Sequence, residues 1–202
     1  MTPLVVVGSG GHARELVALG RACGFTVGGL VSDEEPVVEP MTRRGVSWLG
    51  PLASVADGDR VMLGHGLPAD RAQYAATLST VTLHFETLVH PSSVVVDDAR
   101  LAEGVAVHGL CHISTGVDVG RHVHLGASSV LAHDVRLGAF VTLAPRVVLS
   151  GGVTVGERVF VGAGVVVVPG CTIGDDAVVS AGAVVTRDVP SGVTAKGVPA
   201  RW

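Results

Sequence analysis

Two adjacent residues, His133 and Asp134 in the segment "LAHDVR", have side chains suited to acid–base chemistry. An imidazole exchanges its proton near neutral pH, as a general base must do under physiological conditions. A carboxylate beside an imidazole can fix the ring tautomer and raise its basicity. His133 is therefore the candidate for a group that removes a proton from an attacking nucleophile, with Asp134 assisting it.

A second stretch with chemical meaning is "VVVGSGGHARE", where an apolar run meets a glycine turn. Gly8, Gly10 and Ala13 fit the pattern G-x-G-x-x-A, which binds the pyrophosphate of a dinucleotide at a helix N-terminus. Taken alone, this motif predicts a nicotinamide-binding protein. His12 lies outside the dinucleotide fingerprint and points to a different ligand.

The composition of the chain excludes several classes of protein. A net charge of −4 and an aromatic content of 3% do not suit nucleic-acid binding. No apolar run approaches the roughly 20 residues of a membrane span. The apolar start lacks the basic residues of a signal peptide. The three cysteines lie far apart, so neither a disulfide framework nor a metal site is predicted. We expect a cytoplasmic protein that binds no metal, nucleic acid or membrane.

The elements that position these residues follow from a six-residue repeat. Every sixth residue from Val89 to Val185 is a branched aliphatic, at 17 positions, and a small residue follows each of them four positions later. The pattern predicts a parallel β-helix with three hexads per coil and the aliphatics stacked inside. A valine-rich β-sandwich is the alternative, which the unbroken register disfavours. Glycines that follow the aliphatic are expected to give tight corners their backbone angles; they are Gly120, Gly126, Gly138, Gly156, Gly162 and Gly174.

Residues 1–87 carry a different pattern, in which strands alternate with helices. The expected strands lie at 4–7, 26–31, 61–66 and 81–87, and the expected helices at 11–23, at 68–79 and near Pro51. This alternation predicts a small α/β Rossmann-like domain over 1–87, followed by the β-helix and a short tail over 88–202. The front domain is too short for a complete dinucleotide fold, so its glycine turn favours another ligand.

The hexads and the ending "VTAKGVPARW" resemble the hexapeptide-repeat acyltransferases. The front domain, the "GGH" turn at 10–12, Asp33 and "HPS" at 90–92 resemble the sialic-acid and bacillosamine branch of that family. The resemblance covers nearly the whole chain. It implies a left-handed β-helix, acetyl-CoA as co-substrate and a nucleotide-linked amino sugar as acceptor. It also implies a homotrimer whose active sites lie between subunits.

The same resemblance assigns roles to individual residues. It implies that His133 is the base of an acyl transfer, and that the backbone of Gly151 contacts the thioester one coil away. The family often has glutamate where this chain has Asp134, which leaves the contact of the shorter carboxylate with the imidazole open. It also implies backbone contacts of Ala163 and Ala181 along the pantetheine groove. Lys196, in the tail, is a candidate to meet a coenzyme A phosphate.

The acceptor is expected on the front domain. The resemblance implies a nucleotide site at Gly10, Gly11, His12 and Asp33. Phe160 is a candidate to border the sugar, with simple packing as the alternative role. Thr142 matches a family position that often carries a histidine, and its role stays open. The remaining repeat histidines share no spacing that would stack metal ligands, so we expect them on the surface or between subunits. They are His108, His112, His122 and His124.

We therefore predict an acetyl-CoA-dependent N-acetyltransferase that acts on a UDP- or TDP-linked 4-amino sugar. The attack is expected to be direct, because no cysteine or serine is placed as an acyl carrier. Three alternatives remain: a sialic-acid-type sugar O-acetyltransferase, a dinucleotide-binding protein, and a β-helix without this activity, such as a scaffold or a hexapeptide-type carbonic anhydrase. The sequence does not identify the sugar, the nucleotide or the pathway.

Overall fold

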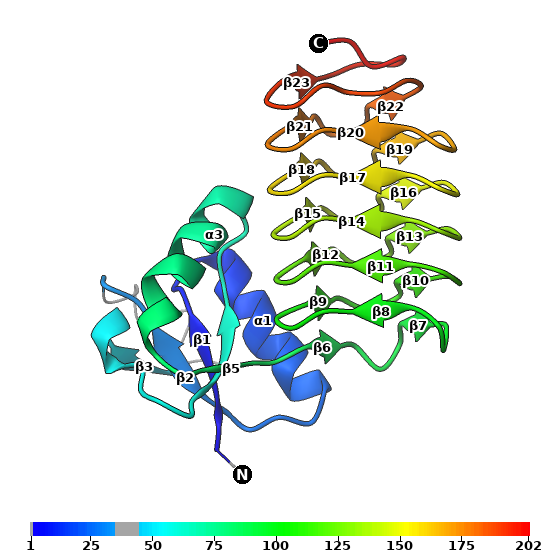
Figure 1. Cartoon of the computed structure of the whole chain (residues 1–202). Helices are drawn as coiled ribbons and strands as arrows, with labels where there is room; N and C mark the ends of the chain where they lie inside the picture. The colour runs from blue at the N-terminus through cyan, green and yellow to red at the C-terminus, as the bar shows by residue number, and fades with distance from the viewer. Residues whose placement is uncertain (1, 35–44) are drawn as a thin grey trace.

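The computed structural model describes residues 2–34 and 45–202, which form a front domain beside a β-helix (Figure 1). The front domain contains a five-stranded parallel sheet in the order β3-β2-β1-β4-β5. Its strands are β1 (Leu4–Val7), β2 (Val27–Val31), β3 (Ser47–Gly50), β4 (Arg60–Leu63) and β5 (His84–Phe85). Its helices are α1 (Gly11–Ala22) and α3 (Pro68–Thr77), with 3₁₀ turns at Leu52–Ser54 and Leu78–Thr80.

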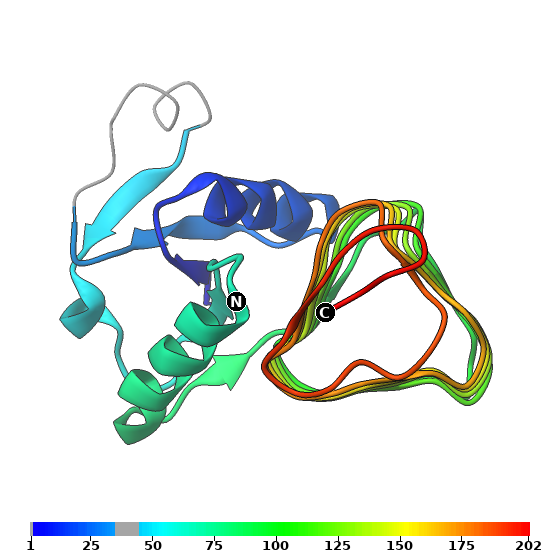
Figure 2. The ribbon, with the colours of Figure 1, turned by 90° about the horizontal axis from the view of Figure 1, so that it is seen from above.

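The two helices lie on opposite faces of this sheet (Figure 2). Leu4 and Val6 of β1 belong to the core cluster that contains α1 residues. Val5 and Val7 belong to a second cluster, which contains Leu78 after α3. Successive strand residues point to opposite faces, so the apolar run of β1 supplies both layers. The parallel sheet that the sequence predicts is therefore present.

Two front-domain elements differ from the sequence prediction. The helix expected near Pro51 is only the 3₁₀ turn Leu52–Ser54, and the sequence does not predict β3. β3 is an edge strand whose residues are all exposed or half-buried. The alternation of apolar and polar residues that marks a half-buried strand is therefore missing from it.

The β-helix has three faces, each of them a parallel sheet of two-residue strands (Figure 2). The docked face, next to the front domain, consists of β6 (Leu88–Val89), β9 (Ala106–Val107), β12 (His124–Leu125), β15 (Thr142–Leu143), β18 (Phe160–Val161), β21 (Val178–Val179) and β23 (Thr194–Ala195). The valine face consists of β7 (Val94–Val95), β10 (His112–Ile113), β13 (Val130–Leu131), β16 (Val148–Leu149), β19 (Val166–Val167) and β22 (Val184–Val185). The polar face consists of β8 (Arg100–Leu101), β11 (Asp118–Val119), β14 (Arg136–Leu137), β17 (Thr154–Val155) and β20 (Thr172–Ile173).

The β-helix predicted from the hexads is confirmed. Residues 18 apart pair between coils, as Val130 does with Val148 and Leu131 with Leu149. The repeated aliphatics and the small residues that follow them form one continuous buried cluster from Val105 to Ala195. Stacking thus buries a core that no single coil could make alone.

The glycines that follow the aliphatics have a different role from the expected one. Positive φ angles fall two residues later in the hexad, as at Asp134 (φ 61°), Phe140 (φ 62°) and Gly152 (φ 69°). A Cβ on Gly138 would instead lie 2.7 Å from the carbonyl carbon of Gly156 in the next coil. The close stacking of coils, rather than corner geometry, therefore requires glycine at these positions.

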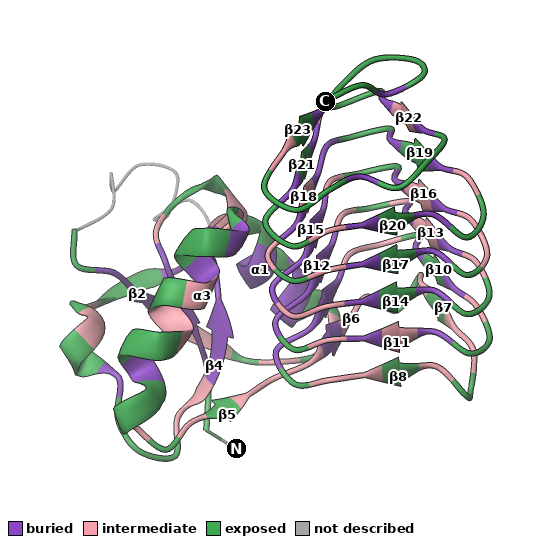
Figure 3. Cartoon of the chain, turned by 45° about the horizontal axis from the view of Figure 1, so that its top comes forward, coloured by how far each residue is buried: buried purple, intermediate pink, exposed green. Residues whose placement is uncertain are grey.

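The outward side chains give each face its own chemistry, and burial varies along the β-helix (Figure 3). On the polar face they are Arg100, Asp118, Arg136, Thr154 and Thr172. On the valine face they are Val94, His112, Val130, Val148, Val166 and Val184. On the docked face, Leu88, Ala106, His124 and Thr142 are buried. The valine face therefore presents a row of apolar side chains to the surroundings of the single chain.

Candidate functional site

A pocket of about 590 Å³ lies between the front domain and the docked face. Its walls come from the turn between β1 and α1 (residues 9–12) and from the loop between β4 and α3 (residues 64–67). The docked face and its following corners close the other side with His124, Gly126, Ala127 and residues 142–145. The pocket thus joins the two parts of the chain that the sequence assigns to acceptor binding and to catalysis.

The glycine turn forms the front wall of this pocket. Gly10 and Gly11 line it together with His12. Nothing lies within 4 Å of the position that a Cβ on Gly10 would occupy. Gly10 is also the N-cap of α1, where backbone N–H groups lack intrahelical partners and suit an anionic group. The structure therefore brings three of the predicted substrate residues together.

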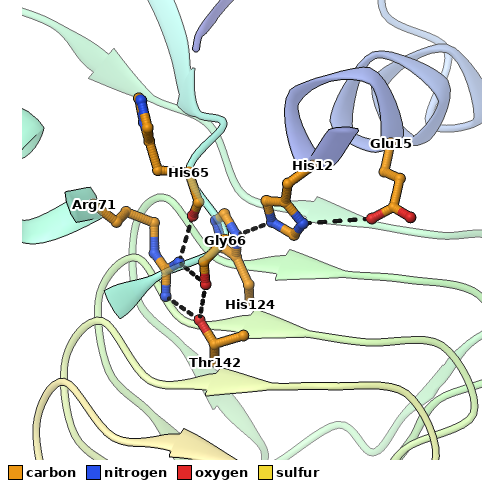
Figure 4. A network of polar contacts seen from close by, with 7 residues as sticks. All are labelled: His12, Glu15, His65, Gly66, Arg71, His124 and Thr142. Carbon is orange, nitrogen blue, oxygen red and sulfur yellow. Dashed lines mark hydrogen bonds and ion pairs between the residues drawn. The ribbon is translucent and has the colours of Figure 1, made fainter. Parts of the chain in front are cut away.

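A pair of histidines crosses from the front domain to the docked face (Figure 4). Nε2 of His12 lies 2.7 Å from Nδ1 of His124, and Nδ1 of His12 lies 3.4 Å from a carboxylate oxygen of Glu15. Glu15 favours a proton on Nδ1 of His12, so Nε2 accepts a hydrogen bond from His124. Burial lowers the pKa of His12 to about 4, and it lowers the pKa of His124 well below its ordinary value. Both imidazoles are therefore neutral near pH 7.

Two of the repeat histidines lie in a different place from the one expected. His122 and His124 are each only 2% exposed, because the front domain covers them within a single chain. The ring of His122 stacks on Phe140 and meets the edge of Phe85 of the front domain. The expectation of a surface or inter-subunit position is wrong for these two, whereas His112 is exposed. The hexad register gives their face of the β-helix but not the domain that covers it.

Arg71 is a site residue that sequence reasoning missed. It is 0% exposed and reaches from α3 into the junction, where all three guanidinium nitrogens donate hydrogen bonds. Figure 4 shows its contacts with His65, Gly66 and Thr142. One of the nitrogens donates to Oγ1 of Thr142 at 2.9 Å, and that hydroxyl donates to the carbonyl of Gly66 at 2.8 Å. Thr142, whose role the sequence left open, therefore connects the two parts of the chain. In "PADRAQYAATLS", Arg71 is indistinguishable from an exposed helix residue.

The other two predicted acceptor residues occupy separate places. Phe160 lines the main pocket from the docked face. Asp33 instead borders a smaller cavity of about 210 Å³ at the carboxyl ends of β1 and β2, where it accepts a hydrogen bond from the backbone of Leu52 at 2.9 Å. Ser9 and His65 line both cavities. The two spaces are therefore neighbours, at the edge of the sheet where parallel α/β domains bind ligands.

The predicted acid–base pair is formed, but outside the pocket. Nδ1 of His133 lies 2.9 Å from a carboxylate oxygen of Asp134. The aspartate therefore contacts the imidazole although its side chain is shorter than that of glutamate. The two side chains are 65% and 70% exposed. They lie in the turn from β13 to β14, at the corner between the valine and polar faces. The main pocket instead lies toward the corner between the docked and valine faces.

The predicted acetyl-CoA residues are divided between the same two corners. Gly151 follows β16 and stacks one coil from His133, so close that a Cβ there would overlap the imidazole. Ala163, Ala181 and Lys196 follow docked-face strands and are exposed. A single chain therefore does not bring all of its predicted acetyl-CoA residues together.

Within residues 2–34 and 45–202, no group of three or more histidine, cysteine, aspartate or glutamate side chains is arranged to hold a metal ion. None of the helices in this described part of the chain combines the length and apolar character needed to cross a bilayer.

Comparison with known proteins adds family relationships. The family model for the bacterial transferase hexapeptide, of six repeats, matches residues 152–187. Among the curated proteins, none matches this chain significantly. One similar structure is a histidine-to-asparagine mutant of perosamine N-acetyltransferase from Caulobacter crescentus in complex with CoA and GDP-perosamine. It is 36% identical with a TM-score of 0.89, and the alignment covers 100% of this chain and 96% of that one.

Two further structures have the same architecture. The acetyltransferase domain of PglB from Neisseria gonorrhoeae, in complex with acetyl coenzyme A, is 26% identical with a TM-score of 0.90 and 98% of each chain covered. WeeI from Acinetobacter baumannii is 23% identical with a TM-score of 0.78, covering 100% of this chain and 99% of that one. WeeI therefore supports the fold alone.

Proposed function

Because the chain belongs to the hexapeptide-repeat acetyltransferases of the bacillosamine and perosamine branch, we propose that it acetylates the amine of a nucleotide-linked amino sugar with acetyl-CoA. One observation carries this proposal: His133, hydrogen-bonded to Asp134, faces the bare backbone of Gly151 in the next coil. The likeness to N-acetyltransferases with CoA, acetyl coenzyme A or GDP-perosamine bound supports the co-substrate and the acceptor class.

His133 acts as the general base in this proposal. Asp134 holds the proton on Nδ1, so Nε2 keeps the lone pair that accepts a proton from the sugar amine as it attacks the thioester carbonyl carbon. The backbone N–H of Gly151 donates to the oxyanion of the tetrahedral intermediate. The C–S bond then breaks, and the proton on His133 passes to the departing thiolate. The products are the N-acetyl sugar and CoA.

A second copy of this chain completes the site. The valine face is apolar and uncovered in the single chain, which suits it to association with other copies. If three valine faces turn toward a threefold axis, the docked–valine corner of one subunit meets the valine–polar corner of the next. The pocket of one subunit then lies against His133 of its neighbour. A homotrimer with active sites between subunits follows from this arrangement.

The same geometry accounts for the divided acetyl-CoA residues. Ala163 and Ala181 succeed one another along the docked–valine corner, above the pocket, and Lys196 lies in the tail beyond them. Across the proposed interface they face Gly151 of the neighbouring subunit. Small side chains on both sides leave a groove for a long pantetheine arm, and the Lys196 ammonium suits a phosphate.

The front domain binds the nucleotide in this proposal. The sheet order β3-β2-β1-β4-β5 supports a Rossmann-like origin, with Gly10, Gly11 and His12 near the phosphates and Asp33 toward the nucleoside. Phe160 borders the sugar from the docked face. We also propose a left-handed winding of the β-helix and a cytoplasmic location. The three free cysteines support that location.

A test of the proposal measures thiol release from acetyl-CoA with GDP-, UDP- and TDP-linked 4-amino sugars and their 4-hydroxy analogues. Release with an amino sugar alone is the expected result. Release with hydroxy sugars alone identifies an O-acetyltransferase instead. If no sugar releases CoA, the proposal is wrong, and a fluorescence titration with NADH then tests the dinucleotide alternative.

A further inference from the structure

Arg71 carries a buried charge at the junction of the front domain and the β-helix. Its Nε donates to the carbonyl of His122 at 2.8 Å, and its Nη1 donates to the carbonyl of His65 at 2.7 Å. Its Nη2 donates to the carbonyls of Phe140 and Val141 at 2.8 and 3.1 Å and to the hydroxyl of Thr142 at 2.9 Å. Within the described part of the chain, no carboxylate forms an ion pair with this guanidinium.

A buried charge without a counter-ion is costly, and apolar side chains of similar volume often replace even buried ion pairs without loss of stability. Filling the junction therefore does not by itself explain why an arginine occupies position 71. Its rigid fork reaches acceptors in several directions at once, which an apolar side chain or a lysine does not do. The position of those acceptors indicates what the fork accomplishes.

Three of the residues that accept hydrogen bonds from Arg71 line the main pocket, and they belong to both of its walls. His65 and Gly66 lie in the loop between β4 and α3, which forms the front wall. Thr142 belongs to the docked face and lines the opposite side. Its hydroxyl accepts from Arg71 and donates to Gly66, so a chain of hydrogen bonds joins the two walls (Figure 4).

We propose that Arg71 is a positioning residue for the acceptor: by its own hydrogen bonds and through Thr142 it holds the His65–Gly66 loop at a fixed distance from the docked face. The inference rests on the proposed function, because it takes this pocket to be the nucleotide-sugar site. Arg71 touches no reacting group and acts through the two walls. Its loss should therefore weaken binding of the nucleotide sugar and leave binding of acetyl-CoA unchanged.

The charge of Arg71 has a second effect on the same pocket. Burial is the largest cause of the lowered pKa of four histidines, and the positive charge of Arg71 is a further cause. They are His12, His65, His122 and His124. The other titratable or charged groups around these imidazoles are Glu15, Asp70, His108 and Arg121. Removal of the guanidinium charge should let the pKa values of the pocket histidines rise.

The decisive variants are Thr142→Val, which removes the hydroxyl at nearly constant volume, and Thr142→Ser, which retains it. Thr142→Val should raise KM for the nucleotide sugar about tenfold, because the Gly66 carbonyl loses the hydrogen bond from the hydroxyl and keeps only a long one from Nη1 of Arg71 at 3.4 Å. KM for acetyl-CoA should stay unchanged, and Thr142→Ser should restore most of the sugar affinity. Thr154→Val on the polar face is the matched control.

Arg71→Met tests the charge, with Arg136→Met on the polar face as its control. Histidine ring signals followed by NMR should titrate at higher pH in Arg71→Met than in the unaltered protein, and calorimetry with GDP and UDP should give weaker binding. Neither readout depends on turnover, so both remain informative if the proposed reaction fails. If Arg71→Met does not fold, the Thr142 pair decides. Equal KM values in Thr142→Val and the unaltered protein, or an equal rise in KM for both substrates, would overturn the inference.

Discussion

Gly151 lies directly above His133 in the β-helix, and no side chain fits between the Gly151 backbone and the imidazole. Their separation of one coil follows from the pairing of residues 18 apart. The carboxylate of Asp134 is hydrogen-bonded to Nδ1 on the other side of the ring. The backbone of Asp134 is left-handed (φ 61°), a conformation that aspartate tolerates better than most residues. The imidazole thus stands between a carboxylate and bare backbone, with Nε2 directed at the glycine.

Gly151→Ala should abolish most activity with little change in Tm. The added methyl overlaps only the exposed imidazole of His133, which can rotate away, so the fold is spared while the base is displaced. We expect a fall in kcat of about 10²-fold, comparable to loss of general-base catalysis. Gly138→Ala is the contrasting variant, because its methyl meets backbone of the next coil. It should lower Tm by several °C. An active Gly151→Ala protein would contradict the assignment.

His133→Ala should reduce kcat about 10²- to 10⁴-fold in the thiol-release assay, with little effect on Tm because the side chain is exposed. Asp134→Gly keeps the left-handed backbone free of strain and removes only the carboxylate. Its loss of kcat should be smaller than that of His133→Ala. His84→Ala, an exposed histidine on β5, is the control. Wild-type turnover by His133→Ala would refute the mechanism.

The sequence predicts most of this fold because the β-helix is a local repeat. The unbroken spacing from Val89 to Val185 determines strand positions, register and the inward residues without knowledge of distant contacts. The same register places Gly151 above His133. The edge strand β3 is not predicted, because neither of its faces is buried and its sequence therefore lacks the alternation of apolar and polar residues.

The junction of the site is less predictable, because it depends on contacts between segments far apart in the chain. The burial of His122 and His124 follows from the docking of the front domain, about which the hexad pattern carries no information. Arg71 is an ordinary helix residue by sequence, and only its acceptors at 122 and 140–142 make it a site residue. Motifs thus identify groups that react, whereas packing identifies those that position them.

The free energy of unfolding should fall as the pH drops from 6.5 toward about 4. His12 and His122 have an ordinary pKa of 6.5 and a folded-state pKa of about 4, so in this window the unfolded chain binds protons that the folded chain does not. Their stabilising contribution is complete above pH 6.5 and is lost as pH approaches the folded-state values. Urea unfolding at several pH values between 6.5 and 5, where most carboxylates stay ionised, measures the slope.

The matched variants for this slope are His122→Asn and His84→Gln. Asparagine tolerates the left-handed backbone of position 122 (φ 55°) and does not titrate, so the slope should become shallower. His84 is exposed, and its replacement should leave the slope unchanged. A slope that His122→Asn does not alter would assign the pH dependence to other groups.

Two inactive variants should restore activity to each other if the site lies between subunits. His133→Ala removes the base, and Gly10→Trp fills the pocket from a position with open space around it. In mixed trimers, a pocket of a His133→Ala subunit meets the intact His133 of a Gly10→Trp subunit. Random assembly from equal amounts pairs them in this way at about one quarter of the interfaces, so about one quarter of the normal activity should return.

The control for this complementation removes the association itself. Val148→Asp buries a charge in the proposed interface and should give monomers in sedimentation velocity, without activity even for the otherwise intact chain. Thr154→Asp places the same charge on the polar face and should change neither the mass nor the activity. If mixed trimers form but remain inactive, the pocket and His133 do not meet across subunits. The proposed inter-subunit site would then be wrong. A site within one chain could not replace it, because a single chain holds these two groups at different corners of the β-helix.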